Sequence, residues 1–417
     1  MTAAHLPGNA EVAVDDRVRR WRLDTPGCAG RIHLNNAGAA LMPRPVLAAV
    51  EGHLRLEAEI GGYEAEDAAA PRVHEAYALV ARLLGARAES VAFVENATVA
   101  VAQALSAFDF QPGDVLVTTH HDYTSNQLMY LALARRRGVE VRRADDLPAG
   151  GVDPGSVRRL VAHPRCRLVA LTWVPTNSGL VQPAAAVGAI CEEAGVPYLL
   201  DACQAVGQLP VDVRELRCDF LAATARKFLR GPRGIGFLYV SDRLLASGAY
   251  PLALDMRGAG LVDEERFELA PGARRFENWE FSYALVLGLG EAARYAGEVG
   301  IGTGGARTQE LAAYARERLA AIPGVRLLDR GPRLCAIITL EVAGWRGADV
   351  MRRLREQGIN TSASTSGCGP FNAPGAAGTS ILRVSPHYYN TREEIDSAVA
   401  AVAGIAAGIA EEGRPDA

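Results

Sequence analysis

Short apolar runs rich in β-branched and aromatic residues alternate with helical patterns through the central part of the chain. Helices are predicted at 98–108, 125–138, 154–162 and 183–195. Strands are predicted around them, at 91–96, 114–120, 139–144, 166–174, 197–202, 219–225 and 235–240. Strands that alternate with helices pair in parallel, because each crossover returns the chain to the same edge of the sheet. The pattern therefore predicts an α/β fold with a mainly parallel sheet.

The pattern changes near Leu285, where long helical stretches replace the alternation. They are followed by a strand at 335–342, a helix at 348–358, a strand at 381–385 and a closing helix that begins near Thr391. We therefore expect two domains. The large α/β domain should cover 31–284, and a smaller α+β domain should combine 1–30 with 285–417.

The charge balance narrows the range of partners. The 417 residues include 44 basic and 48 acidic side chains, for a net charge of -4. Nucleic acid and anionic membranes are therefore not expected as partners. No apolar run reaches the length of a membrane span, and the first residues lack the pattern of a signal peptide. Seven cysteines without a CxxC pair fit a reducing compartment and disfavour a metal site. We expect a cytoplasmic protein with a small-molecule substrate and no metal.

Lys227 is the only lysine in the chain, and arginine supplies all the other basic side chains counted above. At a solvated surface arginine can replace lysine with little effect. A Schiff base, in contrast, needs a primary amine that can lose its proton, which a guanidinium group cannot supply. Lys227 is therefore a candidate nucleophile. The alternative interpretation is a surface lysine that has survived by chance.

Polar side chains follow five of the predicted strands at their carboxyl ends. In open α/β sheets, ligands bind outside these ends, where loops and helix N-termini meet. The segment 96–98 opens a helix, so its N–H groups and the Thr98 hydroxyl suit a phosphate group. The other candidates, in chain order, are Asp122, Tyr123, Asn126, Thr176, Asn177, Asp201 and Lys227. Together these residues predict a cofactor site at one edge of the sheet.

Pyridoxal 5'-phosphate (PLP) is the cofactor whose requirements match this set. It needs a lysine amine, a carboxylate at its pyridine nitrogen, a stacking ring, donors to its phenolate oxygen and a phosphate cradle. The residues that supply these groups, in the same order, are Lys227, Asp201, Tyr123, Gln204 with Thr176, and Thr98 with its neighbours. A dinucleotide site is disfavoured, because no GxGxxG follows the first strand and the glycines of 231–236 open no predicted helix.

Several motifs occur in order along nearly the whole chain, from HLNNAGAA (33–40) to HYYNTREEID (387–396). Between them lie ENATVAV (95–101), LLDACQAVGQLPVDV (199–213) and TARKFLRGPRGIGFLYV (224–240). These motifs resemble those of the class V aminotransferases among the fold-type I PLP enzymes. That family includes cysteine desulfurases, selenocysteine lyases, isopenicillin N epimerase and kynureninase. The resemblance implies a large domain with a seven-stranded, mainly parallel sheet and a smaller C-terminal domain.

The resemblance also implies roles at the cofactor. Asp201 would bind the pyridine nitrogen, Gln204 with Thr176 or Asn177 would lie at the phenolate oxygen, and Lys227 would carry the Schiff base. Tyr123 would stack on the ring in place of the histidine of desulfurases. The phosphate would be bound by Ala97, Thr98, Thr224 and Arg226.

At the substrate end, the resemblance assigns the α-carboxylate to Arg383, with Asn36 and Tyr63 nearby. It also implies a homodimer with shared active sites, in which the segment ARRFENWEFS (273–282) reaches the partner. Relatives carry a phosphate-binding threonine there, whereas this chain has Trp279 and Glu280. Glu280 is therefore expected to face a cation or hydroxyls of the substrate.

The bond that breaks at Cα depends on the substrate pose. Cys368 lies in the loop that carries the nucleophilic cysteine of one desulfurase group, but its neighbours include no basic residue. We therefore favour a β-elimination lyase that cleaves the C–S bond of a cysteine conjugate, in secondary metabolism. The alternatives are a cysteine desulfurase that uses Cys368, an epimerase, a decarboxylating deaminase, an aminotransferase, or a regulatory protein with an inactive cofactor site.

Overall fold

The computed structural model describes residues 9–365 and 380–408. Cys368 and the loop around it therefore lie outside the described residues. Among the helices that are described, none is long and apolar enough to cross a membrane.

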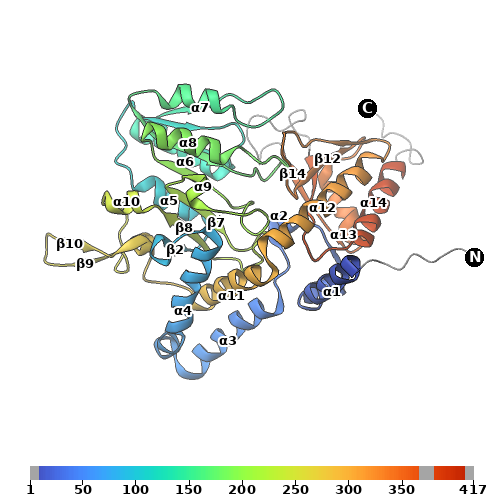
Figure 1. Ribbon diagram of the computed structural model, residues 1–417, viewed down its shortest axis with the longest axis horizontal. Coiled ribbons are helices and arrows are strands. Elements are labelled where there is room, and N and C mark those ends of the chain that lie inside the picture. Colours follow the sequence, from blue (N-terminus) through green and yellow to red (C-terminus); the bar gives the residue numbers. More distant parts are fainter. Residues whose placement is uncertain (1–8, 366–379, 409–417) are drawn as a thin grey trace, which may run out of the picture.

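A seven-stranded sheet forms the centre of the larger part of the molecule (Figure 1), and the predicted α/β class is confirmed. Its order is β2-β8-β7-β6-β5-β3-β4. Only β8 runs antiparallel to its neighbours, because the turn from β7 to β8 is too short for a crossover helix. The strands are β2 (Val91–Val94), β3 (Val115–Thr118), β4 (Glu140–Arg143), β5 (Cys166–Thr172), β6 (Tyr198–Asp201), β7 (Phe220–Thr224) and β8 (Gly236–Val240).

Both faces of this sheet are covered, which explains why its strands read as continuous apolar runs. Side chains alternate between two cores, so Leu171 faces one core and Ala170 the other. The first face is packed by α4 (Gly62–Leu84), α7 (Pro154–Val161), α8 (Ala184–Ala194) and α11 (Tyr283–Val299). The second face is packed by α5 (Ala97–Ser106) and α6 (Thr124–Arg137).

A second, antiparallel sheet lies to the right in Figure 1, in the order β11-β12-β15-β14. Its strands are β11 (Val325–Leu327), β12 (Ile338–Val342), β15 (Ser380–Val384) and β14 (Ser362–Thr365). Helices α12 (Ile301–Ala320), α13 (Gly347–Glu356) and α14 (Arg392–Ala407) pack around it. The last helix begins after Thr391, as predicted, because the Thr391 hydroxyl and the Glu394 carboxylate bond each other's backbone N–H groups in a capping box.

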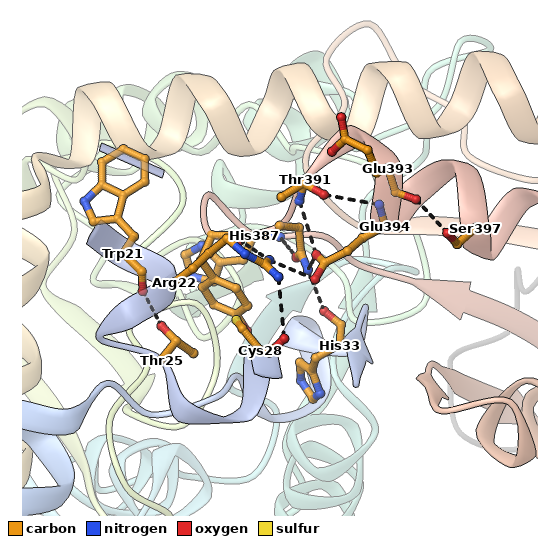
Figure 2. Close-up of polar contacts among 12 residues, drawn as sticks. Trp21, Arg22, Thr25, Cys28, His33, His387, Thr391, Glu393, Glu394 and Ser397 are labelled. Carbon is orange, nitrogen blue, oxygen red and sulfur yellow. Dashed lines mark hydrogen bonds and ion pairs between the residues drawn. The ribbon is translucent and has the colours of Figure 1, made fainter. Parts of the chain in front are cut away.

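The N-terminal segment lies beside this second sheet and contributes a strand to a separate two-stranded sheet. Helix α1 (Asn9–Leu23) lies beside the second sheet, and β1 (Ile32–His33) pairs in parallel with β13 (Ile359–Asn360). Arg22 links the segment to the C-terminal part of the chain, because its guanidinium donates to the Glu394 carboxylate at 2.8 Å (Figure 2). It also donates to the Tyr389 carbonyl at 3.0 Å. The domain boundaries at 30 and 284 stay a prediction. Strand β1 lies in the predicted large domain but pairs with β13 of the predicted small domain.

Some elements were not predicted from the sequence. Residues 44–84 form two helices, α3 (Arg44–Ile60) and α4, that meet at Gly61 with φ of +100°. The hairpin of β9 (Ala259–Leu261) and β10 (Phe267–Leu269) projects from the left of the molecule in Figure 1. Short helices occur at α2 (Asn36–Ala39), α9 (Val213–Leu216) and α10 (Asp242–Ala246).

Gly207 brings the turn after β6 against the segment that carries Lys227. Its φ is +94°, and a β-carbon there would lie 2.3 Å from the carbonyl carbon of Phe228. Gly195 also has positive φ, of +67°, but it faces open space. Gly195→Ala should therefore cost only the left-handed backbone strain, about 1–2 kcal/mol.

We predict that Gly207→Ala lowers the free energy of unfolding by a further ~1–3 kcal/mol, because the new methyl group collides with backbone as well as adding strain. Urea unfolding of the two variants beside the native chain measures the difference. Equal losses in both variants would show that the close approach to Phe228 has no energetic weight.

Candidate active site

A cavity of about 450 Å³ opens at the carboxyl edge of the large sheet. Parallel strands bring their carboxyl ends to the same edge, so residues far apart in the sequence meet there. The size suits a small ligand. The lining residues are Asn96, Ala97, Thr98, Val99, Tyr123, Asn126, Thr172, Val174, Thr176, Asp201, Cys203, Gln204, Thr224, Arg226 and Lys227.

Lys227 follows β7 and places its amine in this cavity, with only 8% of the residue exposed. Burial lowers the pKa of the Lys227 amine, because it disfavours the charged form. The negative charge of Asp201 opposes that effect, and the positive charge of Arg226 adds to it. In the part of the chain that the structure describes, the Nζ atom has no ion pair and no hydrogen bond. The side chain therefore offers a nucleophilic amine.

Asp201 ends β6 beside the lysine. Its Oδ1 accepts a hydrogen bond from the Cys203 backbone N–H at 3.0 Å, and its Oδ2 accepts one from the Asn126 side chain at 3.0 Å. Thr172 lies directly opposite Asp201 in the parallel register of β5 and β6. The carboxylate is thus held at the cavity wall from two sides.

Tyr123 precedes α6 and presents its ring to the same cavity, with 37% of the residue exposed. The Lys227 Nζ lies 5.9 Å from the ring centroid. The backbone N–H of Tyr123 donates to Asp122 at 2.7 Å and to Thr172 at 3.2 Å. These bonds fix the backbone of Tyr123 while its ring stays free to pack on a ligand.

The part of the cavity wall where α5 begins is suited to bind an anion. Helix α5 begins there, and the Asn96 side chain caps it by accepting from the Val99 N–H at 3.1 Å. The first N–H groups of a helix carry partial positive charge and have no partner within the helix. Thr98, Thr224 and Arg226 also line the cavity. Hydroxyls, free N–H groups and a guanidinium are the donors that a phosphate requires.

Arg383, on β15 of the second sheet, is not among the residues that line the cavity, but it bonds to one of them, Thr176. Its Nη1 donates at 2.8 Å to the Thr176 hydroxyl, which also accepts from Gln204 Nε2 at 3.0 Å. Both lone pairs of this hydroxyl are thus used, so its proton remains available for a ligand. Burial lowers the pKa of Arg383 to about 10, and Arg226 acts in the same direction. The buried guanidinium faces neutral oxygens and would gain from an anionic ligand.

The residues present fit PLP. The cavity combines an amine with a lowered pKa, a carboxylate, an aromatic ring and a set of hydrogen-bond donors for an anion. Two buried polar atoms, Gln204 Oε1 and Arg383 Nε, also have no hydrogen-bond partner among the described residues. A bound molecule with polar groups at this end would satisfy them.

Several predicted site residues lie elsewhere. Asn36 is fully buried, and its side chain donates to the Ser385 carbonyl at 2.8 Å and accepts from the Tyr389 hydroxyl. Tyr63 is 74% exposed at the start of α4. Asn177 and the exposed Glu280 are likewise outside the set that lines the cavity. Ala97, Thr98, Tyr123, Thr176, Asp201, Gln204, Thr224, Arg226 and Lys227, in contrast, do meet there.

The sequence analysis missed four lining residues: Val99, Thr172, Val174 and Cys203. Thr172 could have been found, since it ends a strand predicted beside the strand of Asp201. Cys203 carried a weaker signal, because a lone cysteine after a strand is usually a core residue. Burial raises the pKa of the Cys203 thiol, which makes this side chain a poor nucleophile.

The fold and the cavity together define an α/β enzyme with a single buried lysine at a phosphate-type cradle. The family model for class V aminotransferases matches residues 32–398. The chain belongs to this family of PLP-dependent enzymes.

The chain is 30% identical over 387 residues to a probable cysteine desulfurase of Methanothermobacter thermautotrophicus, covering 91% of this chain and 96% of the relative. It is 31% identical over 422 residues to a probable hercynylcysteine sulfoxide lyase of Mycobacterium tuberculosis, covering 97% and 98%. A solved cysteine desulfurase from Escherichia coli superposes with a TM-score of 0.84 at 25% identity, covering 94% of this chain and 98% of that chain.

The lowered pKa of Lys227 can be measured directly, because reductive methylation with ¹³C-formaldehyde labels one lysine besides the N-terminal amine, and the signal that Lys227→Arg removes is that of Lys227. We predict that the ¹³C signal titrates below the pKa of a lysine model peptide, since burial favours the neutral amine. Asp201→Asn should lower the midpoint further, because it removes a negative charge that stabilises the ammonium form. A native midpoint at or above that of the peptide would contradict the buried amine.

Proposed function

We propose that the chain is a PLP-dependent lyase that cleaves the C–S bond of an S-conjugated cysteine by β-elimination. One observation carries the proposal: the described cavity offers an amine for proton transfer but no suitable thiolate. Cys203, the cysteine that lines it, has a pKa raised by burial, and no histidine is among its lining residues. The similarity to a named sulfoxide lyase over almost the whole length of both chains supports the proposal.

PLP, when bound, withdraws electrons from the bonds at Cα. Around it, Thr98, Thr224 and Arg226 would hold the phosphate, and Asp201 would face the pyridine nitrogen. Tyr123 would pack on the ring, and Gln204 and Thr176 would lie at its phenolate oxygen. The finer assignments rest on the match between these residues and the needs of the cofactor.

Arg383 would orient the substrate by pairing with its α-carboxylate, which supplies the anion that this buried guanidinium lacks. Lys227 Nζ would then accept the proton from Cα. The electron pair of the Cα–H bond forms the new Cα–Cβ double bond, and the sulfur group departs with the pair of the Cβ–S bond. Hydrolysis of the resulting enamine gives a keto acid and ammonia, beside a thiol or, from a sulfoxide, a sulfenate.

A cysteine desulfurase is the second candidate, favoured by the 30% identity to the probable desulfurase. That reaction needs a thiolate that takes the substrate sulfur as a persulfide. Cys368 would have to supply it, and its sequence neighbours between 364 and 370 provide hydroxyls and glycines but no cation.

Product analysis separates the two functions. We predict that the holoenzyme converts S-substituted cysteine sulfoxides to pyruvate and ammonia. Lys227→Arg should lower turnover by about 100-fold or more, because it removes the base. Cys368→Ser should keep most of the activity. Borohydride treatment of the native holoenzyme should leave a pyridoxyl group on the peptide that contains Lys227.

The opposite pattern defines the desulfurase. Alanine as the product from free cysteine, a persulfide on Cys368 and loss of turnover in Cys368→Ser would replace the lyase assignment. A pyridoxyl label on the N-terminal amine alone would remove Lys227 from its role.

We also propose that the enzyme acts as a cytoplasmic homodimer in which Glu280 lies near the partner's substrate. The segment around it is firmly held: Arg257 donates to the Asn278 carbonyl at 3.1 Å and stacks on Phe281 at 4.4 Å. Trp279, 47% exposed, and Glu280 point outward from this anchored segment. An exposed tryptophan beside a carboxylate is suited to contact with another molecule.

We predict that Glu280→Thr leaves the dimer intact but raises KM for the native substrate, because a carboxylate that faces a cation or hydroxyls is lost. Glu317→Thr, which replaces an exposed carboxylate on α12, is the matched control and should change neither value. Sedimentation velocity and steady-state kinetics measure both. A fully active monomer would overturn the shared site.

A further inference from the structure

We propose that Asp122 is a positioning residue for this site, which through Asn126 and the Tyr123 backbone orients the cofactor-facing Asp201 and Tyr123. The inference rests on the proposed function, since it concerns groups assigned to PLP. Asp122 does not itself line the cavity. Its influence would pass entirely through hydrogen bonds to residues that do.

Asp122 is only 1% exposed and lies between the end of β3 and the start of α6. Its Oδ2 accepts from the Thr118 hydroxyl at 2.8 Å. Its Oδ1 accepts from the Tyr123 N–H at 2.7 Å, from Asn126 Nδ2 at 3.1 Å and from the Thr172 hydroxyl. Donors from β3, from β5, from α6 and from Tyr123, which precedes α6, thus converge on one buried carboxylate, and the Tyr130 hydroxyl also bonds to it. These bonds compensate for much of its lost hydration.

Asn126 links this carboxylate to the cofactor side. Its Nδ2 donates to Asp122 Oδ1 at 3.1 Å and to Asp201 Oδ2 at 3.0 Å. Asp122 Oδ1 already accepts from the Tyr123 N–H and the Thr172 hydroxyl, so it faces Asn126 as an acceptor and the amide cannot be reversed. The orientation of Asn126 is therefore determined by its two partners.

The same carboxylate also holds the second cofactor-facing group. The Tyr123 N–H points at Asp122 and Thr172, which fixes where the tyrosine ring enters the cavity. Asp201 and Tyr123 come from different elements, and Asp122 bonds to the residue that orients the first and to the backbone of the second. Removing its oxygens would release both at once and leave buried donors unpaired.

Hydrogen bonding and charge can be separated by substitution. Asp122→Ala removes every acceptor, whereas Asp122→Asn keeps an oxygen that can face Tyr123, Thr172 and Asn126 and presents its NH₂ to the Thr118 hydroxyl. Asp114→Ala is the matched control. Asp114 is 6% exposed, lies at the opposite end of β3, accepts from the Gln111 N–H at 2.8 Å and pairs with Arg165 at 3.0 Å.

The experiment titrates each apoprotein with PLP and records affinity, the visible circular dichroism of the bound cofactor and the thermal midpoint of the apoprotein. Asp122→Ala should weaken PLP affinity about tenfold or more, as loss of supporting hydrogen bonds does at metal ligands, and should change the dichroism. Asp122→Asn should restore most of both. Asp114→Ala should lower only the thermal midpoint.

Native affinity and dichroism in Asp122→Ala would overturn the inference, and so would an Asp122→Asn variant as impaired as Asp122→Ala. If Asp122→Ala does not fold, the comparison of Asn126→Ala with Asn126→Ala/Asp122→Asn decides. The inference requires equal PLP affinity in those two proteins, because the amide link is already absent, and a further loss in the double variant contradicts it. A native chain that binds no PLP would instead refute the proposed function.

Discussion

Keeping the Lys227 amine out of water, without a direct ion pair, is the constraint on which the rest of the site depends. A fully hydrated or salt-bridged lysine stays protonated and is a weak nucleophile at neutral pH. Burial at the end of β7 disfavours the charged form, and Asp201 lies near enough to limit that effect. The strands β6 and β7 beside the amine are buried, and Lys227 lines the cavity.

The other buried charged groups of the site, Arg383 and Asp201, also need stabilising contacts before a ligand binds. The Arg383 guanidinium donates to the carbonyl and hydroxyl oxygens of Thr176. The Asp201 carboxylate accepts from the Asn126 amide and the Cys203 backbone N–H. Each charge is stabilised by neutral dipoles, and neither side chain forms an ion pair within 9–365 and 380–408. An incoming anion or cation therefore meets an oriented partner without first breaking a salt bridge.

The sequence was sufficient for the strands of the large sheet and for most of the cavity, because both depend on local patterns. Apolar runs located the strands of the large sheet to within a few residues, and polar residues at their ends identified Lys227, Asp201 and Tyr123 together. Thr172 was missed because its importance comes from the register of β5 against β6. The bond from Asn36 to Ser385 was not predicted, because it joins residues 349 positions apart that no local pattern connects.

That long-range contact has a consequence for protein synthesis. The segment 35–41 bonds to Gln204 and Arg226 of the cofactor site on one side and to Ser385 on the other. At 5–20 residues per second, ribosomes need roughly 9–36 s to progress from Gln204 to Ser385. During that interval the large sheet can form, while the segment 35–41 still lacks its bond to Ser385 and Arg383 has not been synthesised. A nascent chain is therefore committed to its fold before it can hold a substrate.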